Sequence, residues 1–519
     1  MAEDELAPSA AVAAVTEPSE EPTARLTLTP GHGNNARVRA TIHIKTEQEE
    51  EEEQTGATPM SSVLTLCNSA IGAGVLSLPY AFRLSGAVGC FLLCLALGFC
   101  EAFTLYVLSK FSERYRGRTY SVLVRKALGR KLSALLSIIL VVYLWGSCIA
   151  YLVIIGDSFS PLLALAAGAD SVLADRRLVI AVLGVVVILP LCFPRDLGAL
   201  AWVSAAAVLG FVFTALAVVA RSAEIVADRA DWSDIKLFHW DYQALFAIPI
   251  VVFGFNCHAN VVTIFSELQD YPKQILGGLP THPDEFAALG PAIAPRPRTI
   301  KLVGMLGVII SAVTIIMLGY LCVGLAGYLA FPTTVVGNVL LSFPEDDWLM
   351  QVARGVIGLV VTFHYPLNHH PARLAAEHLE GFWFGWTSIS RAFSIAQTCF
   401  FVATSLSVAM VVTDLSDVLH LVGGTAAAFM IFFLPGLLLI NAAVIKESAS
   451  TADLAAMEAN TSASGSGNMS APLLARCDEL GIKRVGITYS PRKSWWAGVF
   501  FVTLSVVIFV ITIVTAIWK

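Results

Sequence analysis

Long apolar stretches separated by shorter polar segments occupy most of the chain from residue 60 onward. A helix that crosses a bilayer needs about 20 mostly apolar residues. Eleven stretches suit that requirement, and we interpret each as one membrane-spanning helix. They are residues 60–82, 87–109, 133–161, 177–193, 198–221, 242–266, 300–330, 349–370, 392–412, 417–442 and 495–517. The pattern predicts an all-α membrane protein with about 11 transmembrane helices.

The composition supports this class and excludes others. Hydrophobic residues make up 56% of the 519 residues and charged residues only 14%, whereas a soluble protein averages about 25% charged residues. Too few charges remain to cover the surface of a soluble protein of this size. A soluble enzyme, a nucleic-acid binder and a fully disordered chain are therefore excluded. We expect a multi-pass integral membrane protein that contacts lipid and binds no nucleic acid.

The first 58 residues differ from the rest of the chain. They hold twelve acidic and four basic residues, including the run from Glu49 to Glu53. Such a composition buries too little apolar surface to fold, so we predict a disordered acidic tail that could bind a cytosolic partner. Residues 59–519 form the predicted transmembrane domain, in which a flexible loop covers 443–494.

Charge in the loops predicts the orientation. The segment 110–131 contains eight Lys and Arg residues and one acid, Glu113, whereas 331–348 contains three acids and no base. Basic loops stay in the cytosol. We therefore expect a cytosolic N-terminus, and eleven spans would leave residue 519 on the opposite side.

The first span is interrupted at its centre by Gly72, Ala73 and Gly74, and Pro79 follows. Backbone groups freed by a helix break are costly in hydrocarbon and are tolerated where protein or a polar ligand covers them. The interruption indicates a binding site. Close helix packing through small residues is the alternative.

The sixth span is also irregular. Pro249 and Gly254 loosen it, and Asn256, His258 and Asn260 bring polar groups near the middle of the membrane. These groups could instead bond neighbouring helices. However, spans one and six begin two successive sets of five helices, and interrupted helices at matching places in two repeats are typical of a transporter site.

The eighth span contains a polar cluster: Thr362, His364, Tyr365, Asn368, His369 and His370. Adjacent His side chains point to different sides of a helix, so we interpret the cluster as the lining of a path and expect no metal site. Glu101 and Glu267 are intramembrane acids, but both lie near the ends of their predicted spans. No paired acids suggest catalysis, so we expect no enzyme activity.

Several of these segments resemble one family. NSAIGAGVLSLPYAF (68–82), SCIAYLVIIGD (147–157) and FNCHANVVTIFSEL (255–268) are similar to the amino acid/auxin permease family, in particular its sodium-coupled neutral amino acid transporters. YPLNHHPAR (365–373) resembles the fungal vacuolar amino acid transporters. The tenth span is similar as well, so the resemblance covers about 60–517 in five ordered motifs.

The resemblance implies a LeuT-like fold, with two inverted five-helix repeats and an eleventh helix. It implies secondary active transport of neutral amino acids, by symport or antiport, at the plasma membrane or a vacuolar or lysosomal membrane. The substrate carboxylate would meet the amides around Gly72, Ala73 and Gly74, since a helix N-terminus attracts anions. Asn256 and His258 would complete the substrate site.

The resemblance also implies a coupling ion, H⁺ or Na⁺, and no other cofactor. Asn68 matches a residue of the family's sodium site. Its partner in span eight is usually a hydroxyl residue, but the position is occupied here by His364, so either Thr362 supplies the oxygen or the coupling ion is a proton. An amino-acid sensor of the same fold, signalling through the tail, is the alternative function. A membrane-embedded enzyme or a channel is a third hypothesis.

Overall fold

The computed structural model describes residues 23–29, 39–45, 57–70, 72–168, 170–194, 201–239, 241–268, 297–386, 390–444 and 491–518. The chain divides into two units, Met1–Ala57 and Thr58–Lys519. The predicted boundary, between 58 and 59, lies one residue from this division.

The first unit contains two strands. β1 (Thr23–Thr29) pairs antiparallel with β2 (Arg39–Lys45), with Thr23 opposite Lys45 and Thr29 opposite Arg39. The tail was expected to be disordered throughout, and a two-stranded ribbon alone is only marginally stable in water. Residues 1–22, 30–38 and 46–56 of the tail lie outside the described residues, as does 445–490 of the predicted 443–494 loop. The disorder and the flexibility stay predictions.

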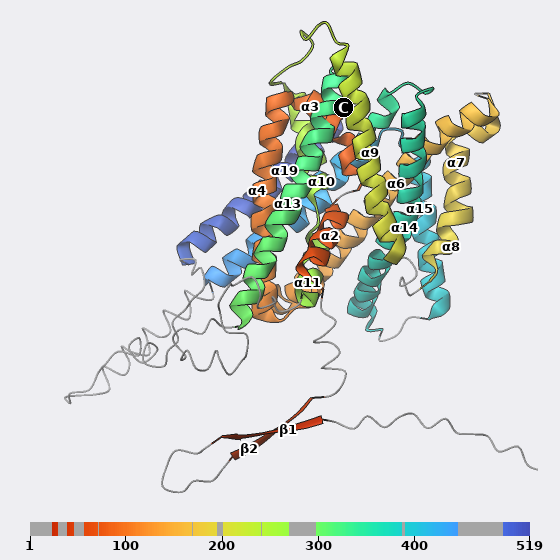
Figure 1. Ribbon diagram of the computed structural model, residues 1–519. Helices are drawn as coiled ribbons and strands as arrows, with labels where there is room; N and C mark the ends of the chain where they lie inside the picture. The colour runs from red at the N-terminus through yellow and green to blue at the C-terminus, as the bar shows by residue number, and fades with distance from the viewer. Residues whose placement is uncertain are drawn as a thin grey trace, which may run out of the picture. The chain divides into compact units, whose positions relative to one another are not determined.

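The second unit is helical, and helices occur in every stretch where the sequence predicts a span (Figure 1). Their bounds are α2 (Pro59–Ala70), α3 (Gly74–Ser85), α4 (Ala87–Tyr115), α5 (Tyr120–Leu128), α6 (Arg130–Ala167), α7 (Arg176–Leu183), α8 (Leu189–Cys192), α9 (Ala201–Ala227), α10 (Ala247–Phe255), α11 (His258–Glu267), α13 (Pro297–Ala330), α14 (Trp348–Phe384), α15 (Arg391–Val411), α16 (Leu415–Val422) and α19 (Pro491–Trp518). The π-helical segments η2 (Gly184–Ile188), η6 (Gly423–Ala427) and η7 (Phe429–Phe433) continue α7 and α16, and the 3₁₀-helices η1 (Val172–Ala174), η4 (Tyr242–Phe246) and η5 (Val339–Ser342) lie between helices.

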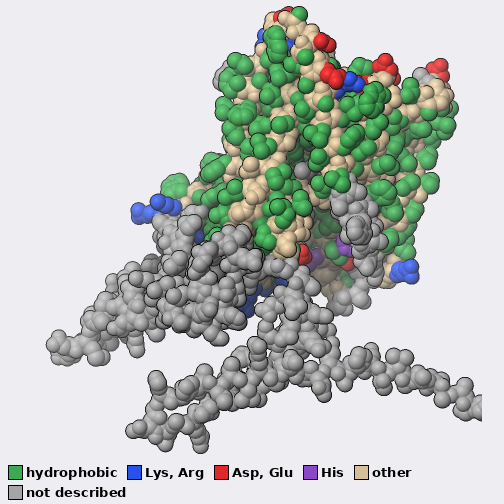
Figure 2. Space-filling model, in the orientation of Figure 1, with side chains coloured by type: hydrophobic (Ala, Val, Ile, Leu, Met, Phe, Trp, Pro, Cys, Tyr) green, Lys and Arg blue, Asp and Glu red, His purple; other side chains and the backbone are tan. Residues whose placement is uncertain are grey.

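Most of these helices are suited to a membrane. Among the described residues, eight helical segments are long and apolar enough to cross a bilayer, and the bent pair α2 and α3 makes a ninth. The segment 176–192 and α14 do not meet the same criteria, so the count of 11 stays a prediction. Figure 2 shows hydrophobic side chains over the flank of the helices and charged side chains mostly toward the two ends. Phe99 and Phe400, both more than 70% exposed, are examples of that apolar flank.

The sequence marks several helix boundaries. The side chains of Thr119, Asp175 and Asp414 accept backbone N–H groups at the starts of α5, α7 and α16, as capping residues do. Gly86 joins α3 to α4 with φ of 82°. A Cβ there would lie 2.7 Å from the carbonyl oxygen of Leu237. Glycine is therefore required both by the backbone conformation and by the close contact.

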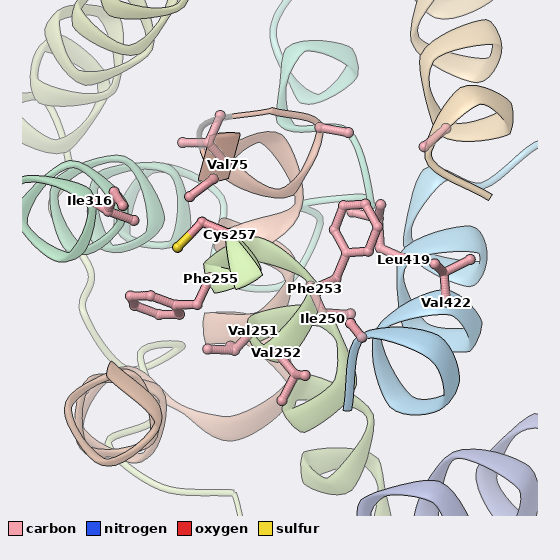
Figure 3. Close-up of a cluster of buried hydrophobic side chains, with 14 of the residues drawn as sticks. Val75, Ile250, Val251, Val252, Phe253, Phe255, Cys257, Ile316, Leu419 and Val422 are labelled. Carbon is pink, nitrogen blue, oxygen red and sulfur yellow. The ribbon is translucent and has the colours of Figure 1, made fainter. Parts of the chain in front are cut away.

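The helix α10 lies at the centre of the buried core. Its residues 247 and 249–255 are all buried. Figure 3 shows side chains of α10 surrounded by Val75 of α3, Ile316 of α13, and Leu419 and Val422 of α16. The longest helices, α6 and α14, pack along each other beside this core. The core therefore holds α3 and α10 against each other near the interruptions predicted in spans one and six.

A buried ion pair joins the end of α6 to its neighbours. The Arg176 side chain donates to Asp157 Oδ1 at 3.0 Å, and Asn338 Nδ2 donates to Asp157 Oδ2 at 3.1 Å.

Removing one partner of a buried pair typically costs 3–5 kcal/mol, because the other charge is left uncompensated. Since Arg176 is partly exposed, we expect Asp157→Ala to cost about 3 kcal/mol. The melting temperature of detergent-purified protein should fall by several degrees. Glu224→Ala, which removes an exposed partner of Arg221, is the matched control and should change it little; equal shifts would contradict the role of the Asp157 pair.

Candidate functional site

The break predicted in span one is present. Helix α2 ends at Ala70 and α3 begins at Gly74, and the two axes are bent by 60°. Gly72 and Ala73 lie between them, and their carbonyl oxygens accept the N–H groups of Val75 and Leu76 at 3.4 and 3.3 Å. The first amides of a helix have no acceptor within it and carry partial positive charge. The amides of Val75 and Leu76 are paired within the turn, and the partial positive charge of the start of α3 is directed at the break.

Span six is broken as well, but not at its proline. Helix α10 ends at Phe255 and α11 begins at His258. Asn256 between them is extended, and its side-chain oxygen accepts the backbone N–H of His258 at 3.3 Å. Pro249 is the third residue of α10, in the first turn, where a missing N–H costs nothing. The break thus depends on Asn256 and Cys257.

The two broken spans meet at a pair of glycines. A Cβ on Gly74 would lie 2.7 Å from Cα of Gly254, which means that α3 and α10 touch through their backbones. Beside this contact, the hydroxyl of Tyr320 on α13 lies 2.9 Å from the carbonyl oxygen of Ala70 and 2.6 Å from that of Gly254. Its single hydrogen is shared between the two carbonyls. Tyr320 therefore joins the ends of α2 and α10, where unpaired carbonyls converge.

Two tyrosines of α6 reach the breaks. A Cβ on Gly72 would lie 3.3 Å from the Tyr151 hydroxyl, which also faces the side chain of Asn368 on α14. The Tyr143 hydroxyl faces the side chain of Asn256. The sequence analysis did not identify Tyr143, Tyr151 or Tyr320. The available signal was a hydroxyl group within an otherwise apolar span.

The predicted ion-coupling residues are only partly brought together. The side-chain oxygen Oδ1 of Asn68 is buried and has no hydrogen-bond partner among the described residues. The Thr362 hydroxyl donates to the Gly358 carbonyl of its own helix at 2.7 Å. The His364 ring lies 6.1 Å from that of Tyr151 and 5.8 Å from that of Phe211, measured between ring centres. Through Tyr151, His364 is close to the first break, but one shared ion site for Asn68, Thr362 and His364 stays a prediction.

His258 lies at the second break with its ring directed to α4. Its Nδ1 is 3.1 Å from Glu101 Oε1, and its Nε2 is 2.9 Å from the Thr104 hydroxyl. Its predicted contact with substrate stays a prediction. The expectation that Glu101 lies near a span end is wrong: it is buried and is the fifteenth of the 29 residues of α4. The helix continues through Lys110 and Glu113 to Tyr115, beyond the apolar stretch that defined the predicted span.

A cavity of about 550 Å³ opens beside the C-terminal half of α3. Tyr80 and Arg83 of α3, Lys236 and Phe246 are among the residues that line it. The cavity lies at the end of α3 that is away from the first break.

Comparison with known proteins agrees with this architecture. The model of the family described as "Transmembrane amino acid transporter protein" matches residues 55–278 and 296–458. Sodium-coupled neutral amino acid transporter 7 of Xenopus laevis is 31% identical over 436 residues, which cover 79% of this chain and 86% of that protein. Vacuolar amino acid transporter 5 of Schizosaccharomyces pombe is 27% identical over 381 residues, covering 72% and 82%.

A solved structure supports the fold. MhsT in complex with L-phenylalanine has a TM-score of 0.50 and 12% identity, and the match covers 88% of this chain and 98% of that one. This similarity confirms the predicted LeuT-like fold. With the family match over most of the chain, it follows that this multi-pass membrane protein belongs to the transmembrane amino acid transporter family.

Proposed function

We propose that the protein is a secondary active transporter of neutral amino acids driven by a proton gradient, and that it is not an enzyme. The observation that carries the proposal is the meeting of two broken helices through Gly74 and Gly254. The amides at the start of α3 would bind the substrate carboxylate, as helix N-termini bind anions. The Tyr151 hydroxyl, beside Gly72, is placed to donate a further hydrogen bond.

The charges around the breaks favour an uncharged substrate side chain. Residues 60–82 and 242–266 contain no Lys, Arg, Asp or Glu. A charged side chain brought to this place would lose its water and find no opposite charge in either broken span, at a cost of several kcal/mol. The carboxyl group beside the second break, that of Glu101 on α4, is already paired with His258. Neutral amino acids avoid that cost.

Two features favour protons over sodium. Carbonyls at the ends of broken helices are groups that coordinate a sodium ion in transporters, but here the Tyr320 hydroxyl occupies the point where those of Ala70 and Gly254 converge. The span-eight position where the resemblance implies a hydroxyl is His364, which is suited to a proton. Sodium is the second candidate, favoured by the name of the Xenopus laevis relative and by the unpaired oxygen of Asn68.

The proposed orientation places the N-terminus in the cytosol, because the basic residues between the end of α4 and the start of α6 belong on that side. The relatives' names include a vacuolar transporter, and the host membrane is proposed to be the plasma membrane or a vacuolar or lysosomal membrane.

Exchange of labelled amino acids tests the substrate class. Proteoliposomes loaded with one unlabelled amino acid should take up labelled alanine, leucine, glutamine or phenylalanine, with lysine and glutamate at least about tenfold slower, because a desolvated charge costs more than the 1.4 kcal/mol that tenfold represents. Exchange of lysine or glutamate at the same rate would contradict the neutral specificity. Binding of a neutral amino acid without exchange would instead support a sensor.

A further inference from the structure

We propose that Glu101 of α4 and His258 of α11 together bind the proton whose movement is coupled to that of the substrate. This inference rests on the proposed function and adds the location of the coupling site. It also gives a role to a pair of polar side chains that lies beside the second helix break.

The pair is isolated from water. The side chain of His258 is 0% exposed and that of Glu101 is 2% exposed. Among the described residues, His258 is the one ion-pair partner recorded for Glu101. Intramembrane ionisable residues are rare and mark ion pathways and proton relays.

The hydrogen bonds restrict where protons can be. The Thr104 hydroxyl lies 3.0 Å from the carbonyl oxygens of Cys100 and Glu101 on its own helix, and it has one hydrogen, which it donates there. Its oxygen is left to accept a hydrogen bond from His258 Nε2, 2.9 Å away. Nε2 is therefore assigned the N–H of the imidazole.

That assignment leaves Nδ1 beside the carboxyl group, 3.1 Å from Glu101 Oε1. The distance is that of an ion pair, but the geometry is not that of a hydrogen bond, so Nδ1 is a buried nitrogen without a hydrogen-bond partner among the described residues. Two arrangements fit this contact. In one, a protonated Glu101 faces a neutral imidazole, and in the other an imidazolium faces a carboxylate. Both place one proton on the pair, either on Nδ1 or on the carboxyl group, and are uncharged overall, so the pair is neutral with one proton bound and carries a charge of −1 without it.

The surroundings do not compensate that negative charge. Among the described residues, four other titratable groups interact with the carboxyl group: Cys100 on α4, Cys257 at the break, Tyr143 on α6 and Tyr320 on α13. All four are neutral when protonated. The Cys257 thiol lies 3.5 Å from Glu101 Oε1 and offers one weak hydrogen bond. An unpaired buried charge costs several kcal/mol, so the pair should release its proton only in a conformation that admits water.

Glu101 and His258 are placed so that a change in their protonation can affect both helix breaks. His258 is the first residue of α11, and its N–H is held by Asn256 in the second break. Tyr320, close to the carboxyl group, bonds the ends of α2 and α10. One proton from the acidic side neutralises the pair, and its departure to the other side restores the −1 state, so one full cycle moves one proton.

The test measures proton and substrate movement together. The full chain is reconstituted in vesicles that contain a pH-sensitive dye, and labelled leucine uptake and the proton influx evoked by leucine are recorded. Glu101→Gln removes the titrating carboxyl group with little change of shape. The ratio of protons to leucine should fall at least about tenfold, since an uncharged amide cannot carry the proton. Glu267→Gln, an exposed acid at the end of α11, is the matched control and should keep the wild-type ratio.

Thr104→Val provides a second readout if Glu101→Gln fails to fold. It removes the acceptor of the Nε2 hydrogen bond but keeps both titrating groups. The pH midpoint of leucine uptake should move downward, because a proton on the pair strengthens the hydrogen bond from Nε2, and the variant removes that bond. A purely structural role would lower the amount of folded protein and leave the midpoint unchanged.

Other outcomes separate this inference from the proposed function. Unchanged proton movement in Glu101→Gln overturns the assignment of Glu101 and His258 and leaves the proton-driven transporter proposal intact. A wild-type protein that exchanges leucine but moves no protons overturns both the assignment and the proton coupling, and leaves only amino acid transport. Loss of the proton-to-leucine ratio in His364→Ala but not in Glu101→Gln also overturns the assignment. No exchange of any neutral amino acid would overturn the proposed function itself.

Discussion

Replacement of Gly72 by alanine should raise the concentration of substrate needed for half-maximal uptake by about tenfold, equivalent to 1.4 kcal/mol, while thermal stability changes little. Gly72 does not have a positive φ, so its backbone accepts a side chain. The added methyl group would lie 3.3 Å from the Tyr151 hydroxyl and would displace this donor by a few tenths of an ångström. Uptake of labelled leucine against concentration measures the effect.

Three comparisons make the Gly72 result specific. Gly319→Ala has open space around the new methyl group and should transport like the wild type. Tyr151→Phe removes the hydroxyl directly, and combining it with Gly72→Ala should add little, because both changes act on one group. Normal uptake by Gly72→Ala and by Tyr151→Phe would contradict a substrate site at the first break.

Gly74→Ala, unlike Gly72→Ala, should reduce stability as well as transport. Its methyl group would lie 2.7 Å from Cα of Gly254, and neither backbone can move without separating α3 from α10. We expect a loss of stability of about 1–3 kcal/mol, as for other overpacked sites, together with a loss of transport. The contrast with Gly72 distinguishes a packing glycine from one beside the substrate.

Tyr320→Phe should strongly reduce transport and should lower stability by about 1–3 kcal/mol, the cost of leaving a buried polar group unsatisfied. The hydroxyl of Tyr320 is shared by the carbonyls of Ala70 and Gly254, and phenylalanine cannot replace it. The two helix ends would then be held only by packing, so the relative position of the breaks should become variable. Melting temperature and leucine exchange are measured on the same preparation.

Tyr120→Phe is the control for Tyr320. The Tyr120 hydroxyl is also buried and donates to one backbone carbonyl, that of Met430, at 2.9 Å. The Tyr120→Phe variant should lower stability by about as much as Tyr320→Phe does, and it should leave the exchange rate per folded molecule unchanged. Equal effects of the two variants on exchange would indicate that Tyr320 has only a structural role.

Much of the helical architecture could be predicted from the sequence, because the length and apolar composition of each stretch indicate a membrane-spanning helix without reference to the rest of the chain. The first break was also predictable, since the run Gly72-Ala73-Gly74 is a local feature. The second was predicted from Pro249 and Gly254 as well as the polar residues, but Pro249 lies inside the first turn of α10. The chain is interrupted instead at Asn256 and Cys257.

The contacts that complete the site could not be predicted from one sequence. Glu101 and His258 are on different helices, 157 positions apart, and Tyr320 meets Ala70 across 250 positions. Such contacts depend on how the helices pack against one another, and the pattern of apolar residues along the chain does not specify that packing. The predicted span 87–109 already placed Glu101 eight residues before its end, so its place within the helix could be read from the sequence, whereas its burial against α11 could not.

Gradient-driven accumulation by the wild-type protein tests the central proposal most directly. Proteoliposomes in sodium-free buffer are given an acidic exterior, and labelled leucine inside and outside is measured over time. We expect leucine to accumulate above its external concentration, to leave when the proton gradient is collapsed, and to be unaffected by added sodium. Accumulation that requires a sodium gradient and ignores the proton gradient would contradict proton coupling and would direct attention to Asn68 and Thr362.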